Sequence, residues 1–194
     1  MKPNPSQLSP LIRSDVQGLI LARLFMAASE EFSVTELSEY SFTSVPTAMR
    51  EVDRLIEAEY VSERTLGRVR LIRANQDHPM FNPIFQIVAY SYGPAAVLPS
   101  ALSNLFGLQE AYLYGPWAAK LAQKAGPNPT DIDVVLIGNM VRIDATRALA
   151  NAERVIGRTI NVQFASNFDW DRGESEFIRK VKASPMLKLA LPNG

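Results

Sequence analysis

The sequence contains no cysteine and a single histidine among its 194 residues. The absence of cysteine excludes a disulfide framework, zinc sites with thiolate ligands and catalysis by a cysteine nucleophile. One histidine is a poor basis for a metal site, and His78 has no nearby serine or cysteine with which to form a catalytic triad. We therefore expect His78 to be a structural hydrogen-bonding residue.

The sequence also lacks an excess of positive charge. Lys+Arg and Asp+Glu are 20 each, which excludes nucleic-acid binding through bulk charge and leaves only a local basic patch for that purpose. There is no secretory signal, and no apolar run approaches the ~20 residues of a membrane span. With 47% hydrophobic and 21% charged residues, the composition is typical of a globular protein. We expect a cytoplasmic protein without membrane contact.

Residues 15–59 show the periodicity of three consecutive helices. The first begins at Asp15, and the second follows residues 33–36, where a serine and a glutamate three positions later form a capping-box pattern. The third is predicted from about residue 44 to residue 59, with its apolar side chains within one arc.

Two short strand-like runs, residues 60–64 and 68–73, follow the third helix and are separated by a turn at 65–67. Three helices followed by a basic hairpin are the plan of a winged helix-turn-helix. We expect this domain at residues 14–78, after a flexible arm at residues 1–13.

The positive charge of the N-terminal half is concentrated in the hairpin. Residues 1–75 contain 9 basic and 10 acidic residues, whereas residues 60–75 contain four arginines and one glutamate. In a winged helix the third helix enters the major groove and the wing contacts phosphates. The alternative is a solvated hairpin used for protein contacts; the acidic residues of the third helix count slightly in its favour, but we expect DNA binding. The candidates are Ser44, Thr47 and Arg50 for base edges, and Arg54, Arg64, Arg68 and Arg70 for phosphates.

The second half begins with a largely apolar segment. Residues 79–108 predict a helical linker that is broken near Gly93, and residues 84–108 could form a dimer or interdomain surface. Strands and helices then alternate through residues 109–194, which predicts a mixed α/β domain. The fold class is therefore α+β overall.

A pair of aspartates opens one strand of this domain. Asp131 and Asp133 lie two residues apart on the expected strand, so both carboxylates face one side, where they repel each other unless a cation lies between them. Mg²⁺ prefers such hard oxygen ligands. Upstream, a strand ends at Gly115 before a helix whose N-terminus could receive a phosphate. This arrangement could hold a metal–nucleotide complex.

Two sequence motifs around Gly115 and the aspartate pair resemble those of a known protein family. Residues 114–118 (YGPWA) followed by residues 130–135 (TDIDVV) resemble the core motif of the polymerase-beta-like nucleotidyltransferases in their minimal form. Residues 15–191, including residues 74–79 and 157–162, resemble a bacterial and archaeal group that joins an ArsR-like or MarR-like winged helix to such a domain.

The resemblance implies a nucleotidyltransferase-like domain at residues 109–194 with Mg²⁺ and a nucleotide as cofactors. Asp131 and Asp133 would then be the catalytic and metal-binding residues, and Gly115 would hold phosphate. Trp117 could stack on a base or belong to the core, and Lys120 could neutralise a phosphate or be solvated.

The sequence departs from the family pattern at several positions. Pro116 stands where the family has serine, and it offers a phosphate neither a hydroxyl nor an N–H. The later strand carries Asn161 and Gln163 and no third acid. We therefore expect the transferase site to be catalytically degenerate, while catalysis, ligand binding without catalysis and a scaffold role all stay open.

Two functions follow from these patterns. The first is a homodimeric regulator that binds double-stranded DNA and whose second domain is a ligand sensor, dimerisation module or partner-docking module. The alternative is a Mg²⁺-dependent nucleotidyltransferase of the toxin–antitoxin type that modifies an RNA, a protein or a small molecule. The eroded transferase motif favours the first.

Overall fold

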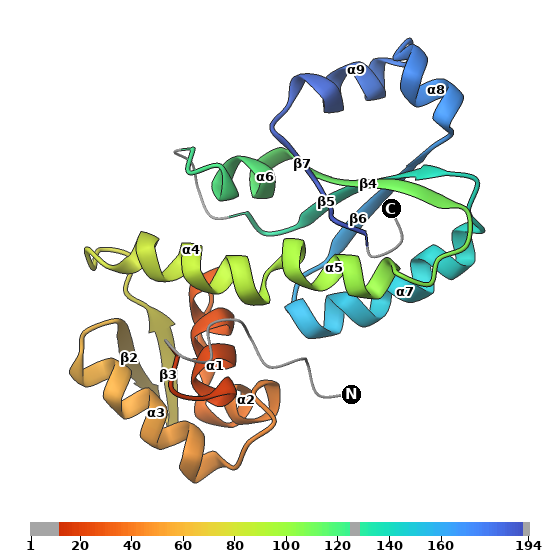
Figure 1. Cartoon of the computed structure of the whole chain (residues 1–194). Helices are drawn as coiled ribbons and strands as arrows, with labels where there is room; N and C mark the ends of the chain where they lie inside the picture. Colours follow the sequence, from red (N-terminus) through yellow and green to blue (C-terminus); the bar gives the residue numbers. More distant parts are fainter. Residues whose placement is uncertain (1–11, 125–128, 192–194) are drawn as a thin grey trace. The chain divides into compact units, whose positions relative to one another are not determined.

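The computed structural model describes residues 12–124 and 129–191, which form a mixed α+β structure with two separate sheets (Figure 1). The chain divides into two compact units, Met1–Gly93 and Pro94–Gly194. The boundary lies inside the segment 79–108 that was expected to be a linker, so the two helices of that segment belong to different units.

A flexible arm was expected at residues 1–13. Residues 1–11 of that segment lie outside the described residues. Ile12 is buried, and Arg13 Nη2 donates a 2.8 Å hydrogen bond to Glu51 Oε2. These two residues pack against the N-terminal unit, so the expectation of an arm is wrong for them. The glycine and prolines of residues 126–129 predict a loop, most of which also lies outside the described residues.

The N-terminal unit combines four helices with a three-stranded sheet within its described part, residues 12–93. In chain order the elements are α1 (Asp15–Met26), β1 (Phe32–Ser33), α2 (Val34–Tyr40), α3 (Val45–Glu57), β2 (Val61–Leu66), β3 (Val69–Ala74) and α4 (Phe81–Tyr92). The strand order is β1-β3-β2, and both pairings are antiparallel.

Side-chain caps define where the first two helices begin. Ser14 Oγ accepts a hydrogen bond from the backbone N–H of Gln17 at the start of α1. Ser33 and Glu36 form the expected capping box at the start of α2. In α3, Pro46 occupies the first turn, where its missing N–H costs no helical hydrogen bond. The capping box predicted from the sequence is therefore confirmed.

The core of the N-terminal unit lies between α1 and α4. The rings of Phe25 and Phe81 stack with their centroids 5.3 Å apart, and Phe85 is fully buried. The two helices approach closely at Gly18, where an added Cβ would lie 2.0 Å from the hydroxyl oxygen of Tyr92. This packing makes α4 an integral part of the N-terminal unit.

The C-terminal unit is built on a four-stranded sheet with the order β6-β5-β4-β7. β5 and β6 are parallel, and the other two pairings are antiparallel. α8 and α9 lie on one side of the sheet, and α5 and α7 lie on the other (Figure 1). α8 is not among the elements that the sequence predicted. The elements are α5 (Pro94–Leu102), β4 (Leu108–Tyr114), α6 (Gly115–Leu121), β5 (Ile132–Gly138), α7 (Arg142–Ile156), β6 (Ile160–Ala165), α8 (Asn167–Arg172), α9 (Glu176–Ala183) and β7 (Met186–Lys188).

β5 is the central strand of the C-terminal core. Val135 and Ile137 pack against Trp170 of α8 and Val181 of α9. Because side chains alternate along a strand, Asp133 belongs to the same face of the sheet, at the beginning of β5. Among the helices of the described residues, none is long and apolar enough to cross a membrane.

Candidate functional site

The three residues expected to contact base edges form one row along the start of α3. Ser44 is the N-cap residue, but its side chain makes no capping hydrogen bond. Its hydroxyl lies 3.0 Å from Thr47 Oγ1, and Arg50 Nη2 donates to that same oxygen at 3.2 Å. Residues three apart share a helix face, and the opposite face is buried through Ala48 and Val52. The structure thus brings the groove candidates together on an accessible surface.

Two of the expected phosphate ligands are ion-paired within the chain. Arg54 Nη1 lies 2.9 Å from Glu51 Oε1. Arg64 Nε donates to Glu31 Oε1 at 2.8 Å, and its Nη2 makes a second contact with the same carboxylate. The hydrogen bond from Arg64 lowers the pKa of Glu31, so the carboxylate stays charged. A phosphate would have to compete with both acidic partners.

Arg70 has a different position from the one expected for a phosphate ligand. It lies half-buried on the same side of β3 as the buried Ile72 and Ala74. Its Nη2 donates to Asp53 Oδ1 of α3 and its Nε donates to Glu63 Oε2 of β2, each at 2.8 Å. These hydrogen bonds, the one to Asp53 first, raise the pKa of the Arg70 guanidinium. Arg70 therefore connects α3 to the hairpin.

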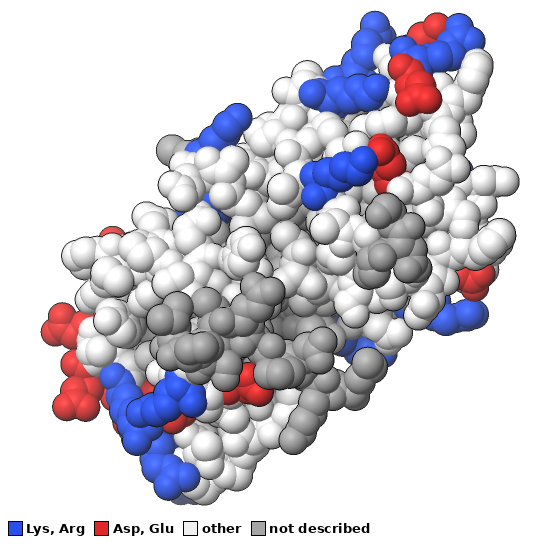
Figure 2. Space-filling model, in the orientation of Figure 1, with Lys and Arg blue, Asp and Glu red and all other residues white. Residues whose placement is uncertain are grey.

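Two other arginines of the hairpin are accessible. Arg68 follows Gly67 in the turn between β2 and β3, and Arg73 lies near the end of β3. Both are exposed, and neither makes an ion pair with any residue in the two described ranges. Arg73 was not among the expected phosphate ligands, although it belongs to the same basic run. Basic and acidic side chains lie beside one another over α3 and the hairpin (Figure 2).

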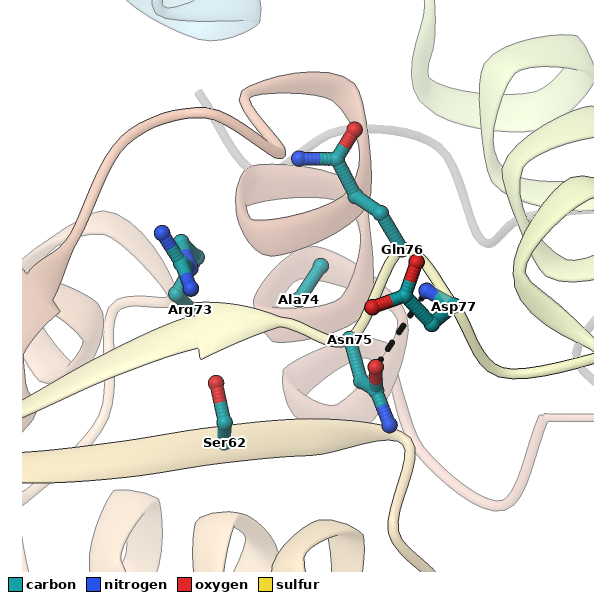
Figure 3. A pocket seen from close by; sticks show the side chains of 6 residues that line it. All are labelled: Ser62, Arg73, Ala74, Asn75, Gln76 and Asp77. Atoms are coloured by element: carbon teal, nitrogen blue, oxygen red, sulfur yellow. Dashed lines mark hydrogen bonds between the residues drawn. The ribbon is translucent and has the colours of Figure 1, made fainter.

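A polar pocket of about 330 Å³ lies at the base of the hairpin (Figure 3). The amide side chains that line this pocket donate hydrogen bonds to backbone carbonyl oxygens of the same unit. Gln76 Nε2 donates to Ala28 O at 3.0 Å, and Asn75 Nδ2 donates to Glu59 O at 3.0 Å. These contacts attach the segment after β3 to the rest of the unit. The lining residues are Ser62, Arg73, Ala74, Asn75, Gln76 and Asp77.

The two aspartates meet one amide side chain. Asp131 precedes β5 and is exposed, and Asp133 is half-buried within it. The parallel register places Asn161 of β6 beside Asp133. Asn161 Nδ2 donates to Asp133 Oδ1 at 3.2 Å and to Asp131 Oδ2 at 3.5 Å. One amide group therefore lies where two negative charges converge.

Gly115 and Tyr114 complete the surroundings of Asp133. Gly115 has a φ of +70°, and an added Cβ would lie 3.2 Å from Asp133 Oδ2. Tyr114 pairs with Asp133 across β4 and β5. Burial, and then the charge of Asp133, raise the pKa of the Tyr114 hydroxyl. Gly115, both aspartates and Asn161 are thus neighbours, as the sequence motif predicted for its glycine and acids.

The other expected nucleotide-binding residues lie elsewhere. Trp117 is fully buried, so of the two roles expected for its ring the core role holds and stacking on a base is wrong. Lys120 lies in the last turn of α6, half-buried and five residues beyond Gly115.

The third side chain beside the two aspartates is an amide and not a carboxylate. Within the described parts of the chain, no three His, Cys, Asp or Glu side chains are grouped to hold a metal ion. The third side chain at the carboxylates, Asn161, presents a hydrogen-bond donor to them rather than a further oxygen ligand.

No family model matches the chain, and the searches of curated proteins and of solved structures likewise found no match.

Proposed function

We propose that the N-terminal unit is a winged helix-turn-helix that binds double-stranded DNA through α3 and the hairpin. The element order α1-β1-α2-α3-β2-β3 and the strand order β1-β3-β2 support it, because they join the hairpin directly to the helix pair. The observation that carries the proposal is the polar row on α3, whose members face solvent at the helix end that reads base edges in such domains.

The basic residues differ in their contacts within the chain, so we assign them different roles in DNA binding. Arg50 is exposed and can hydrogen-bond to a guanine edge, while Ser44 and Thr47 can donate to or accept from either base. Arg68 and Arg73 take the phosphate role because both are exposed and neither forms an ion pair with a described residue, although the charge of Arg73 helps to lower the pKa of Glu31. Arg70 is left out of the interface because it holds the hairpin onto α3.

The test is the salt dependence of duplex binding, measured by fluorescence anisotropy. Each phosphate contact contributes about 0.9 to the slope of log K against log salt concentration. We expect Arg68→Gln to weaken binding and to lower that slope by about one contact. Arg68→Lys should keep the slope, since a point charge is enough at a phosphate.

Arg179→Gln is the matched control, because Arg179 is an exposed arginine of α9 in the other unit and the change in net charge is the same. It should leave the slope unaltered. Absence of duplex binding by the wild-type protein at low salt would contradict the proposal, as would equal slopes for the wild type, Arg68→Gln and Arg50→Gln.

For the C-terminal unit we propose a non-catalytic role as a sensor or partner-docking module. The proximity of Gly115, Asp131 and Asp133 favours the second candidate function, nucleotidyl transfer, but the donor group of Asn161 and the burial of Trp117 oppose it. Incubation with labelled nucleotides and Mg²⁺ separates the two. Transfer of label that disappears in Asp131→Ala would replace the regulator with an enzyme.

We further propose that the chain is a homodimer whose twofold axis passes along α4. Residues 79–109 contain no Asp, Glu, Lys or Arg, although charged residues are 21% of the chain. Within that segment, Ile87 and Tyr90 are 42% and 71% exposed on α4. An uncharged surface has nothing to repel its own copy, and depletion of charge is typical of interface centres. Two copies would present two α3 helices to a palindromic site.

A further inference from the structure

An aromatic residue occupies a strained position in the turn between α2 and α3. Phe42 has a φ of 53°, in the left-handed region that bulky residues rarely adopt. Its N–H donates to Glu39 O at 3.2 Å, and the N–H of Thr43 donates to Ser38 O at 3.0 Å. This pair of bonds is a Schellman motif with Phe42 at the position where helices usually carry glycine.

Folding does not account for phenylalanine at this position. The side chain is 81% exposed, so its ring gains little from burial while its backbone conformation costs free energy. Glu59 and Gln123 end their helices in the same left-handed conformation, with φ of 58° and 57°. Both carry exposed polar side chains, whereas Phe42 presents a large apolar ring to water. An exposed ring on a strained backbone indicates a contact outside the chain.

The surroundings of Phe42 indicate which contact this is. Phe42 lies two residues before the N-cap of α3, at the helix end that carries the polar row of Ser44, Thr47 and Arg50. Val45 is also exposed in the first turn. With Met49 of α3, which is also exposed, these apolar side chains are few beside the roughly 20–30 residues that each partner contributes to a stable protein interface. They suit the apolar edges of bases beside the polar row.

We propose that Phe42 contacts the methyl groups of thymines in the major groove, next to the bases that α3 reads. The proposal rests on the proposed DNA binding and names a specificity-determining residue within it. An aromatic ring can pack against the thymine C5-methyl group, which is the apolar feature of the major groove.

The decisive variant is Phe42→Gly, which removes the ring and relieves the backbone strain together. We expect its thermal midpoint to equal or exceed that of the wild type, and its affinity for the tightest duplex from a random pool to fall several-fold. The slope of log K against log salt concentration should stay unchanged, because no phosphate contact is lost. Gln123→Gly is the matched control, with the same φ, no change in charge and no expected effect on affinity.

A second measurement tests the chemical identity of the contact. Replacing each thymine of that duplex in turn by uracil removes a single methyl group. At one or two positions the wild type should bind the uracil duplex more weakly, while Phe42→Gly should bind both duplexes equally. Uracil duplexes that bind the wild type as tightly as thymine duplexes would overturn the proposal.

Failure of the Phe42 contact and failure of DNA binding itself would give different results. If the wild type binds no duplex, DNA binding itself fails. If the wild type binds with an arginine-dependent salt slope but Phe42→Gly binds equally well, the Phe42 contact is refuted while DNA binding survives.

Discussion

Asn161 is the hydrogen-bond donor that the carboxylates of Asp131 and Asp133 share. Two carboxylates that share a site repel each other, and a cation or a hydrogen-bond donor between them relieves the repulsion. Here the donor is supplied by the chain itself, because β6 runs parallel to β5 in the register that sets Asn161 beside Asp133. The amide of Asn161 therefore offsets part of the repulsion between the two carboxylates.

The corresponding prediction is that Asn161→Asp creates a Mg²⁺ site. Without Mg²⁺ the variant should melt below the wild type, since a third carboxylate adds repulsion where an amide donor stood. At a Mg²⁺ concentration of ten times its dissociation constant, binding should restore about 1.4 kcal/mol. Differential scanning fluorimetry with and without Mg²⁺ measures both shifts.

Asn161→Ala provides the control, because it removes the donor without adding a ligand. Its melting temperature should fall equally with and without Mg²⁺. A wild-type protein that Mg²⁺ stabilises as strongly as Asn161→Asp would show that the amide does not replace the cation.

The sequence located the candidate residues but not their partners. The spacing of Ser44, Thr47 and Arg50 was sufficient to predict one helix face, because helical geometry is local. The ion pair of Arg64 with Glu31 joins residues 33 positions apart, and no local pattern could indicate it. Arg70 shows the same limit, since only the assembled sheet shows that it faces α3.

At the scale of elements, the predictions succeeded where the determinants are local. The start of α2 was predicted correctly because the serine and glutamate of its capping box lie only three positions apart. β1 was missed because a two-residue strand exists only through its pairing with β3. α8 was missed because six residues are too few for a periodic signal.

The capping box of α2 gives a prediction at this scale. Replacing Ser33 by alanine should lower the free energy of unfolding by about 1 kcal/mol, measured by urea denaturation at neutral pH. The backbone N–H of Ser33, and then its hydroxyl, donate to the Glu36 carboxylate and hold its pKa below 4.5. This contribution is therefore present above pH 4.5 and is lost as the pH falls through the lowered pKa.

Glu36→Gln isolates that pH dependence. The amide oxygen can still accept from Ser33, so stability at neutral pH should change little, while the part of the acid destabilisation due to Glu36 should disappear. Wild type and Glu36→Gln losing stability in parallel between pH 5 and pH 3 would argue against the capping role of the carboxylate.

At the scale of the whole molecule, the sequence predicted two structured halves but misplaced the transition between them. The largely apolar segment 79–108 was interpreted as a helical linker that is broken near Gly93. In the structure α4 packs on α1 through Phe25 and Phe81, while α5 packs on α7 in the other unit. The boundary between the two units depends on tertiary contacts, which cannot be inferred from amino-acid composition.

The uncharged segment 79–109 leads to the last prediction, which concerns assembly. If the exposed face of α4 joins two copies, Tyr90→Lys places two ammonium groups against each other near the twofold axis, where repulsion and desolvation oppose association. Light scattering after size-exclusion chromatography should give twice the chain mass for the wild type and the chain mass for the variant. Phe168→Lys, at a 64% exposed aromatic of α8, should remain dimeric.

Because a monomer presents only one α3 to a palindromic site, Tyr90→Lys should also bind such a duplex more weakly than a Phe168→Lys dimer does. A monomeric wild type, or a Tyr90→Lys variant that stays dimeric, would exclude α4 as the interface.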